Sequence, residues 1–290
     1  MAGFSSVKAL VDAELAGQST FFTWRKSPTA VSTVGIWLDL SMSPGNPIPQ
    51  YYAATPLVSV QMSQSATGGL YHSGPVYPKS KFIKTLGVMA TAATATPMAM
   101  ILLDYLLYYP FIDEGNTDEQ FMNVGVVTPA GLPRSTDGKG VQIMAVSVAA
   151  RTGGQKFTVN YTNQDGIAGR TTIAVVENTA TATGNIVSCA TATNLSAGPF
   201  LPLQLGDTGV RSIQSVTMQG ADVGLFTLVL VKPIETLSVR GIDAFCEKNC
   251  FMDGATIDKV DDDAYLNFIC LPQGTLNATA LHGYMSVVWN

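Results

Sequence analysis

The sequence has little charge. Asp, Glu, Lys and Arg make up 13% of its 290 residues, roughly half of the ~25% that is usual in soluble proteins. The net charge is −5, and no run of Lys or Arg occurs. Proteins that bind nucleic acid directly carry basic clusters, so we expect no direct contact with nucleic acid. Thr, Ala, Gly and Ser replace much of the charge, which indicates that neighbouring chains cover part of the surface.

Long hydrophobic runs are also missing. The most apolar segment, Leu86–Tyr109, contains Gly87, Pro97, three threonines and Asp104. A bilayer span needs roughly 20 continuous apolar residues, so we expect a buried core segment and no membrane helix. Residues 1–20 lack the basic region and apolar block of a secretory signal.

Cysteine and histidine are scarce. The four cysteines are too few for a disulfide framework in a chain of this length, and the Cys246–Cys250 spacer is one residue longer than that of a zinc knuckle. Only two histidines exist, His72 and His282, and neither is near these cysteines in the sequence. We therefore expect reduced, mostly buried thiols and no metal site at Cys189, Cys246, Cys250 and Cys270.

Motifs of known chemistry are absent as well. The sequence has no G-x-S-x-G elbow and neither of the glycine-rich nucleotide-binding loops. Two histidines leave little room for a Ser-His-Asp triad. A carboxylate pair from distant loops stays open as a route to glycoside hydrolysis. We expect no enzyme, no catalytic residue and no cofactor.

The clearest positive pattern lies in Lys156–Val176. Phe157, Val159 and Tyr161 alternate with polar residues, and the alternation resumes after residues 163–166, where Ile167, Gly169, Thr171, Ile173 and Val175 share one face. A period of two is typical of half-buried strands. The Asn-Gln-Asp-Gly sequence between the arms tolerates positive φ. The segment predicts a long β-hairpin with one face on a core.

Many other segments have the same character. The fold predicted is mainly β, a β-sandwich or jelly-roll with an extended N-terminal arm and about two short helices. A soft boundary divides residues 1–115, the arm and a looser β region, from a compact β domain at residues 116–290. The helices expected are Phe4–Gly17 and Met98–Tyr109, the latter with a strand as the alternative. Further strands are expected at Val34–Leu40, Leu57–Gln64, Lys81–Ala93, Phe121–Thr128, Val141–Ala150, Val210–Met218, Leu225–Val231, Tyr265–Leu271 and Gly283–Trp289.

The N-terminal region is the candidate partner-binding site. The Phe4–Gly17 helix has an apolar stripe, and it either docks on a neighbouring subunit or on its own domain. Aromatic bulk beside two positive charges follows it, and Trp, Phe and Arg are common at interface hot spots. The alternative is an ordinary strand with Phe22 and Trp24 inward. The candidate residues are Phe21, Phe22, Trp24, Arg25 and Lys26.

An acidic segment, Ile112–Gln120, carries Asp113, Glu114, Asp118 and Glu119. These carboxylates could hold Ca²⁺, but they lack the alternating oxygen ligands of an EF-hand. We therefore expect a solvated loop without a metal ion.

Three segments resemble a group of virion proteins from tailed bacteriophages: DYLLYYPFIDEGNTDEQ at 104–120, LPRSTDGKG at 132–140 and FTVNYTNQDGIAGRT at 157–171. Together they lie within the middle half of the chain. The group consists of structural or decoration proteins, so the resemblance implies a multimeric particle component of β-sandwich type, located in the virion and assembled in the host cytoplasm. It carries no catalytic signature and assigns no site residue.

We therefore expect a decoration, or cement, protein on the outer shell. Its partners are the major capsid protein or other virion proteins, and it forms a homo-oligomer such as a trimer. The alternative is a tail, collar or head-tail connector component, followed by a major capsid protein or a glycan-binding virion module. If residues 1–26 are an anchor on neighbouring subunits, deleting them should weaken shell binding and leave the β domain folded.

Overall fold

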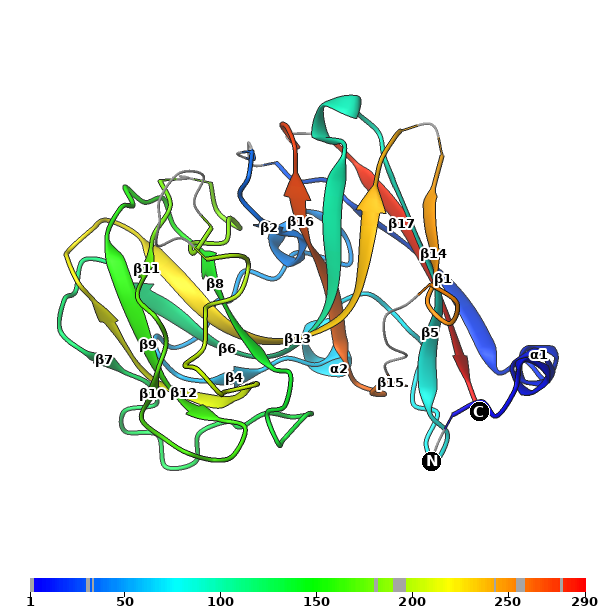
Figure 1. Cartoon of the computed structure of the whole chain (residues 1–290), viewed down its shortest axis with the longest axis horizontal. Coiled ribbons are helices and arrows are strands. Elements are labelled where there is room, and N and C mark those ends of the chain that lie inside the picture. The colour runs from blue at the N-terminus through cyan, green and yellow to red at the C-terminus, as the bar shows by residue number, and fades with distance from the viewer. Residues whose placement is uncertain are drawn as a thin grey trace.

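A computed structural model describes residues 3–29, 32, 34–179, 182–189, 197–242, 244–253, 259–276 and 279–290. The described chain is mainly β, with three antiparallel sheets in a sandwich-like arrangement and two short α-helices (Figure 1). The mainly β fold with about two helices is confirmed. The helices are α1 (Val7–Leu15) and α2 (Gln64–Thr67), and two 3₁₀ turns are η1 (Leu40–Met42) and η2 (Ala93–Ala95). No helix in these ranges is long and apolar enough to cross a membrane.

Sheet B is central and shares its long strands with both ends of the molecule. Its order is β2 (Leu38–Asp39), β16 (Tyr265–Pro272), β6 (Met98–Asp113), β13 (Leu225–Val239) and β8 (Gln142–Ser147), with β4 (Val60–Gln61) also on β6. Sheet A has the order β14 (Cys246–Asn249), β5 (Lys81–Ala90), β17 (Leu281–Trp289), β1 (Ser19–Lys26) and β3 (Gly45–Asn46), with β15 (Lys259–Val260) on β5. Sheet C has the order β10 (Arg170–Thr171), β9 (Lys156–Asn163), β12 (Val210–Met218) and β7 (Gln120–Phe121), with β11 (Val175–Val176) on β9.

Three apolar clusters explain this arrangement. The first joins the Met98 end of β6 to sheet A, and the second joins its Ile112 end to sheet C. Alternate residues of β6, such as Leu103 and Tyr105, point to the opposite face of sheet B. There they form a third cluster with residues from loops that cover this face. Both β6 and β13 therefore contribute to the packing of sheet A and of sheet C, and Figure 1 shows them running between the two ends of the molecule.

The helix predicted at Met98–Tyr109 is wrong, and the strand alternative is right. The segment is β6, paired with β13 on one side and β16 on the other. Both of its faces are buried over most of its length, so residues 98–109 are apolar except for Asp104 and show no alternation. Pro110, expected to end a helix, lies instead where the β6–β13 register shifts between Tyr109 and Ile112. Such a bulge accommodates proline in a strand.

The predicted hairpin is present, but its second arm differs. Phe157, Val159 and Tyr161 are fully buried on β9. The backbone reverses at Gly166, whose φ is +80°. In the second arm the Thr172 hydroxyl accepts a hydrogen bond from the Val159 amide at 3.0 Å. The ladder is interrupted there, Thr172 is buried, and Ile167 and Ile173, expected on the inner face, are exposed.

The expected N-terminal arm is partly built into the fold. Strand β1 lies inside sheet A between β17 and β3, and only α1 stands outside (Figure 1). Sheets A and B each combine strands from both sides of residue 115: β1 pairs with β17, and β6 pairs with β13 and β16. The strands expected at 34–40 and 57–64 are reduced to two residues each, and of the one expected at 121–128 only Phe121 belongs to a strand. Strands β5, β8, β12, β13, β16 and β17 lie where strands were predicted.

The cysteines are all free thiols, as predicted. Cys189, Cys250 and Cys270 are buried and Cys246 is half-buried. Burial raises the pKa of Cys189 and of Cys250 to about 12, so these thiols stay protonated at neutral pH.

Candidate interaction surface

Helix α1 begins and ends as its sequence predicts. The Ser6 hydroxyl caps it by accepting a hydrogen bond from the Ala9 amide at 3.1 Å. Gly17 follows the helix with a φ of +72°, a conformation that glycine adopts without a steric penalty. The helix is held by the Glu14–Lys84 ion pair at 2.6 Å and by the preceding Phe4, which packs on Phe82 of β5.

The apolar stripe of α1 faces solvent. Val7 is 73% exposed, Val11 47% and Leu15 83%, and Ala13 is the buried residue of the helix. Three apolar side chains at helical spacing are thus left without cover. An apolar helix face normally packs against another element, so the exposed stripe is a surface that a partner could cover.

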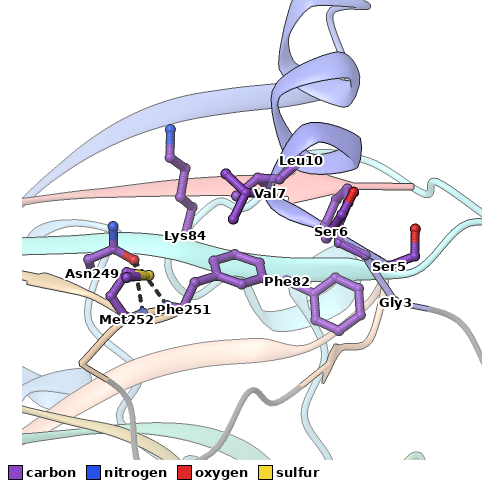
Figure 2. A pocket seen from close by; sticks show the side chains of 11 residues that line it. Gly3, Ser5, Ser6, Val7, Leu10, Phe82, Lys84, Asn249, Phe251 and Met252 are labelled. Atoms are coloured by element: carbon purple, nitrogen blue, oxygen red, sulfur yellow. Dashed lines mark hydrogen bonds between the residues drawn. The ribbon is translucent and has the colours of Figure 1, made fainter.

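A cavity of about 590 Å³ opens beside this stripe (Figure 2). Val7 and Leu10 line it from α1, and Phe82 and Phe251 line it from the sheet side. The side chains of Ser5, Ser6, Lys84 and Asn249 supply its few polar groups. The cavity is therefore an apolar recess continuous with the α1 stripe, suited to receive an apolar side chain from another molecule. We call the stripe and this recess the α1 surface.

An aromatic cluster lies on the outer face of sheet A. Phe21 of β1 stacks on Tyr284 of β17 with ring centroids 5.1 Å apart, and Phe245 meets Tyr284 edge-on at 5.3 Å. The Tyr284 hydroxyl donates a hydrogen bond to Glu247. The ring of Tyr284 lies over Gly87 of β5, where a Cβ atom would collide with it. Phe21 is 59% exposed and Phe245 42%. This cluster therefore adds apolar surface to sheet A, the sheet against which α1 is held.

The five predicted partner residues are divided by the alternation of β1. Trp24 is buried against Phe268, and Lys26 is fully buried. The Lys26 ammonium donates to the carbonyls of Ser43 and Pro47 at 3.0 and 2.8 Å, and burial lowers its pKa to about 8. Trp24 and Lys26 are therefore inaccessible to a partner, which corrects the grouping of all five residues at one surface.

The remaining three residues differ in access. Phe22 is half-buried and packs edge-on against Tyr71. Phe21 and Arg25 point outward, and their role as partner-binding residues stays a prediction. The inward placement of Phe22 and Trp24 matches the alternative of an ordinary strand.

Sequence reasoning did not find Phe245, Phe251, Met252 or Tyr284. They are brought to the N-terminal region by the pairing of β14 and β17 with β5. Their segments lie far from residues 4–26 in the sequence, so no local pattern connects them with the N-terminal region. The apolar stripe of α1 is evident in the sequence, and the structure shows that Val7, Val11 and Leu15 do not dock on the domain of their own chain.

The buried polar groups elsewhere serve the fold. Asp39, fully buried, accepts hydrogen bonds from the hydroxyls of Tyr52 and Tyr105 at 2.5 and 2.6 Å. His72 is also fully buried: its Nε2 lies 2.8 Å from the carbonyl oxygen of Ala264, and its Nδ1 lies 3.2 Å from the Lys81 ammonium. Both ring nitrogens of His72 are thus engaged inside the protein.

Comparisons with known proteins add little. No family model matches the chain, and no curated protein matches it. Among solved structures, the chain is similar to one from T=1 particles derived from infectious bursal virus, with 10% identity, a TM-score of 0.19, and coverage of 94% of this chain and 78% of that chain. The VP2 subviral particle of infectious bursal disease virus gives 9% identity, a TM-score of 0.18, and coverage of 94% and 81%. At such TM-scores the likeness carries no argument about this chain.

Proposed function

We propose that the protein is a non-enzymatic structural component of a virion, a decoration protein that binds the outer shell through the α1 surface. The observation that carries the proposal is the exposed stripe of Val7, Val11 and Leu15 beside an open apolar recess. Covering such a surface stabilises a complex by about 25 cal/mol per Å² of apolar area removed from water.

Three further features support the proposal. Only 13% of the residues are charged, and the net charge is −5. Both values suit a protein on the particle surface that does not contact the genome. The mainly β fold, with loops that connect its three sheets, suits close packing between chains. The resemblance of three segments to virion proteins of tailed bacteriophages implies the same class. The partner proposed is the major capsid protein, with further copies of this chain completing a homo-oligomer such as a trimer.

The copy number in purified particles separates the candidate positions. Quantitative mass spectrometry would give the ratio of this chain to the major capsid protein. A ratio near unity supports decoration of the whole shell. A ratio of a few per cent would move the protein to the tail, collar or connector, and the decoration proposal would be dropped.

The α1 surface is tested by paired substitutions that keep the helix. Val11→Ser and Leu15→Gln remove apolar groups from the stripe at little cost in helix propensity. We expect the double variant to fold normally and to bind undecorated shells much more weakly. Lys8→Gln is the matched control, because it changes an exposed polar residue of the same helix. If the double variant bound shells with native affinity, α1 would not be part of the interface.

A further inference from the structure

Three carboxylates from distant segments meet at the sheet C end of the molecule. Glu114 follows β6, Glu177 follows β11, and Asp222 lies between β12 and β13. One carboxylate oxygen from each lies within 4.8 Å of the other two. Glu114 belongs to the acidic segment that was expected to be a solvated loop, but its side chain is fully buried.

The oxygens of this cluster are short of partners. Glu177 is 1% exposed, and neither of its carboxylate oxygens has a hydrogen-bond partner. Oε2 of Glu114 and Oδ2 of Asp222 are likewise buried without a partner. A buried carboxylate that no donor satisfies is costly. The fully buried Glu177, aimed at its two neighbours, therefore points to a ligand that supplies positive charge.

Arg151 meets only part of that demand, because its Nε and Nη1 are also buried without a hydrogen-bond partner and neither donates to Glu177. Its Nη2 donates to Oε1 of Glu114 at 2.7 Å, and both side chains are fully buried. This contact leaves Oε2 of Glu114 free. Three carboxylates and one guanidinium leave a local charge of −2, which one divalent cation would neutralise. Arg151 would then orient Glu114 from outside the ligand set, as charged neighbours of metal ligands commonly do.

We propose that Glu114, Glu177 and Asp222 bind a Ca²⁺ ion. Carboxylate oxygens are the ligands that hard cations prefer, and Ca²⁺ binds them at about 2.3–2.6 Å. Ligands on opposite sides of Ca²⁺ are thus about 4.6–5.2 Å apart, so oxygens that lie within 4.8 Å of one another can share one ion. Mg²⁺ demands near-ideal octahedral geometry and gives up its waters reluctantly, whereas Ca²⁺ tolerates an irregular set of carboxylates. Asp222 is half-buried, so the cluster reaches solvent on its side.

The ion would join the end of β6, the end of β11 and the β12–β13 connection. These segments belong to sheets B and C, so the ion would fasten sheet C to the central sheet. This role is independent of the shell-binding proposal, because it concerns the isolated chain.

The competing state is a shared proton. Without an ion, burial, with the neighbouring carboxylates adding to it, raises the pKa of Glu114 to about 7 and of Glu177 to about 8. One or two protonated carboxyls could then reduce the repulsion without any metal. The two states differ in their response to Ca²⁺ and to removal of one carboxylate.

The experiment measures calcium binding by calorimetry, and thermal unfolding in millimolar CaCl₂ against EDTA, on the full chain at neutral pH. We expect the native protein to bind one Ca²⁺ and to unfold at a higher temperature in CaCl₂. Glu177→Gln should weaken binding at least about tenfold and abolish the calcium-dependent shift. Asp118→Asn, in the same acidic segment but exposed, should keep both.

The Glu177→Gln result can be interpreted even if the substitution changes the stability of the protein. Glu177→Gln removes a buried charge, so it should fold and be no less stable than the native protein in EDTA. Equal unfolding temperatures of the native protein in CaCl₂ and EDTA would overturn the proposal in favour of the shared proton. A full calcium response in Glu177→Gln would overturn it too, as would a response to Mg²⁺ equal to that to Ca²⁺.

Discussion

Arg134 donates two parallel hydrogen bonds to the carboxylate of Asp104 inside the protein. Its Nε and Nη2 lie 2.9 and 2.6 Å from the two carboxylate oxygens. The remaining donors reach the backbone carbonyls of Met62, Tyr105 and Asp263. One side chain thus ties the loop after β7 to the middle of β6.

Breaking this pair should destabilise the fold strongly. Arg134→Ala leaves Asp104 charged, buried and without its main partner, and we expect a loss of about 3–5 kcal/mol in the free energy of unfolding. Arg134→Lys should recover only part of it, because an ammonium cannot form both bonds. Urea unfolding checks this, with Lys139→Ala, an exposed change in the same loop, as the control. A loss below about 1 kcal/mol for Arg134→Ala would contradict the assignment.

The stability should fall in acid partly through His72. Burial lowers its pKa from 6.5 to about 4, so the unfolded chain binds a proton more readily than the folded one. The resulting loss of unfolding free energy is absent above pH 6.5. It grows as the pH falls toward 4, where it reaches about 3 kcal/mol. We expect His72→Gln to flatten the fall in unfolding free energy over this window. His282→Gln is the matched control, and an equal effect of both substitutions would contradict the prediction.

Truncation should separate α1 from the fold. Deleting residues 1–17 removes α1, the Glu14–Lys84 ion pair and the contact of Phe4 with Phe82, but no strand of a sheet, so we expect a cooperative unfolding transition at a somewhat lower temperature than that of the full chain. Deleting residues 1–26 also removes β1, an interior strand with the buried Trp24 and Lys26. That longer deletion should abolish cooperative unfolding, contrary to the expectation from sequence. Circular dichroism during heating measures both, and a stable product lacking residues 1–26 would refute the role given to β1.

Gly283 of β17 should not accept a side chain. A Cβ atom at this position would collide with the indole of the buried Trp24. We expect Gly283→Ala to cost about 1–3 kcal/mol, the range of overpacked cores. Gly131→Ala is the control, because its added methyl group would meet nothing within 4 Å. Similar unfolding midpoints for the two variants would show that Trp24 can move aside.

The strands with one buried face were predictable from sequence. Strand β12 lies where its alternation placed it, and so does β9. Strand β6 was mistaken for a helix because both of its faces are buried, which removes the alternation. In β1 the period of two could assign Phe22 and Trp24 to the core, yet it could not show that the charged Lys26 follows them inward.

The cluster of Glu114, Glu177 and Asp222 could not be predicted from the sequence for a different reason. Glu114 was considered as a ligand together with its chain neighbours Asp113, Asp118 and Glu119. Its real neighbours, Glu177 and Asp222, come from segments that only the packing of sheet C on sheet B brings close. Ligand sets assembled across sheets leave no spacing motif, whereas those within one loop do.

The sharing of β6 and β13 by both ends of the molecule has a mechanical consequence. Two lobes joined by a linker can swing about a hinge, but here two continuous, mutually hydrogen-bonded strands cross from one lobe to the other. A load that pulls the lobes apart acts along both backbones in parallel, and the hydrogen bonds between the two strands keep them from bending independently. The molecule should therefore transmit force as a stiff strut.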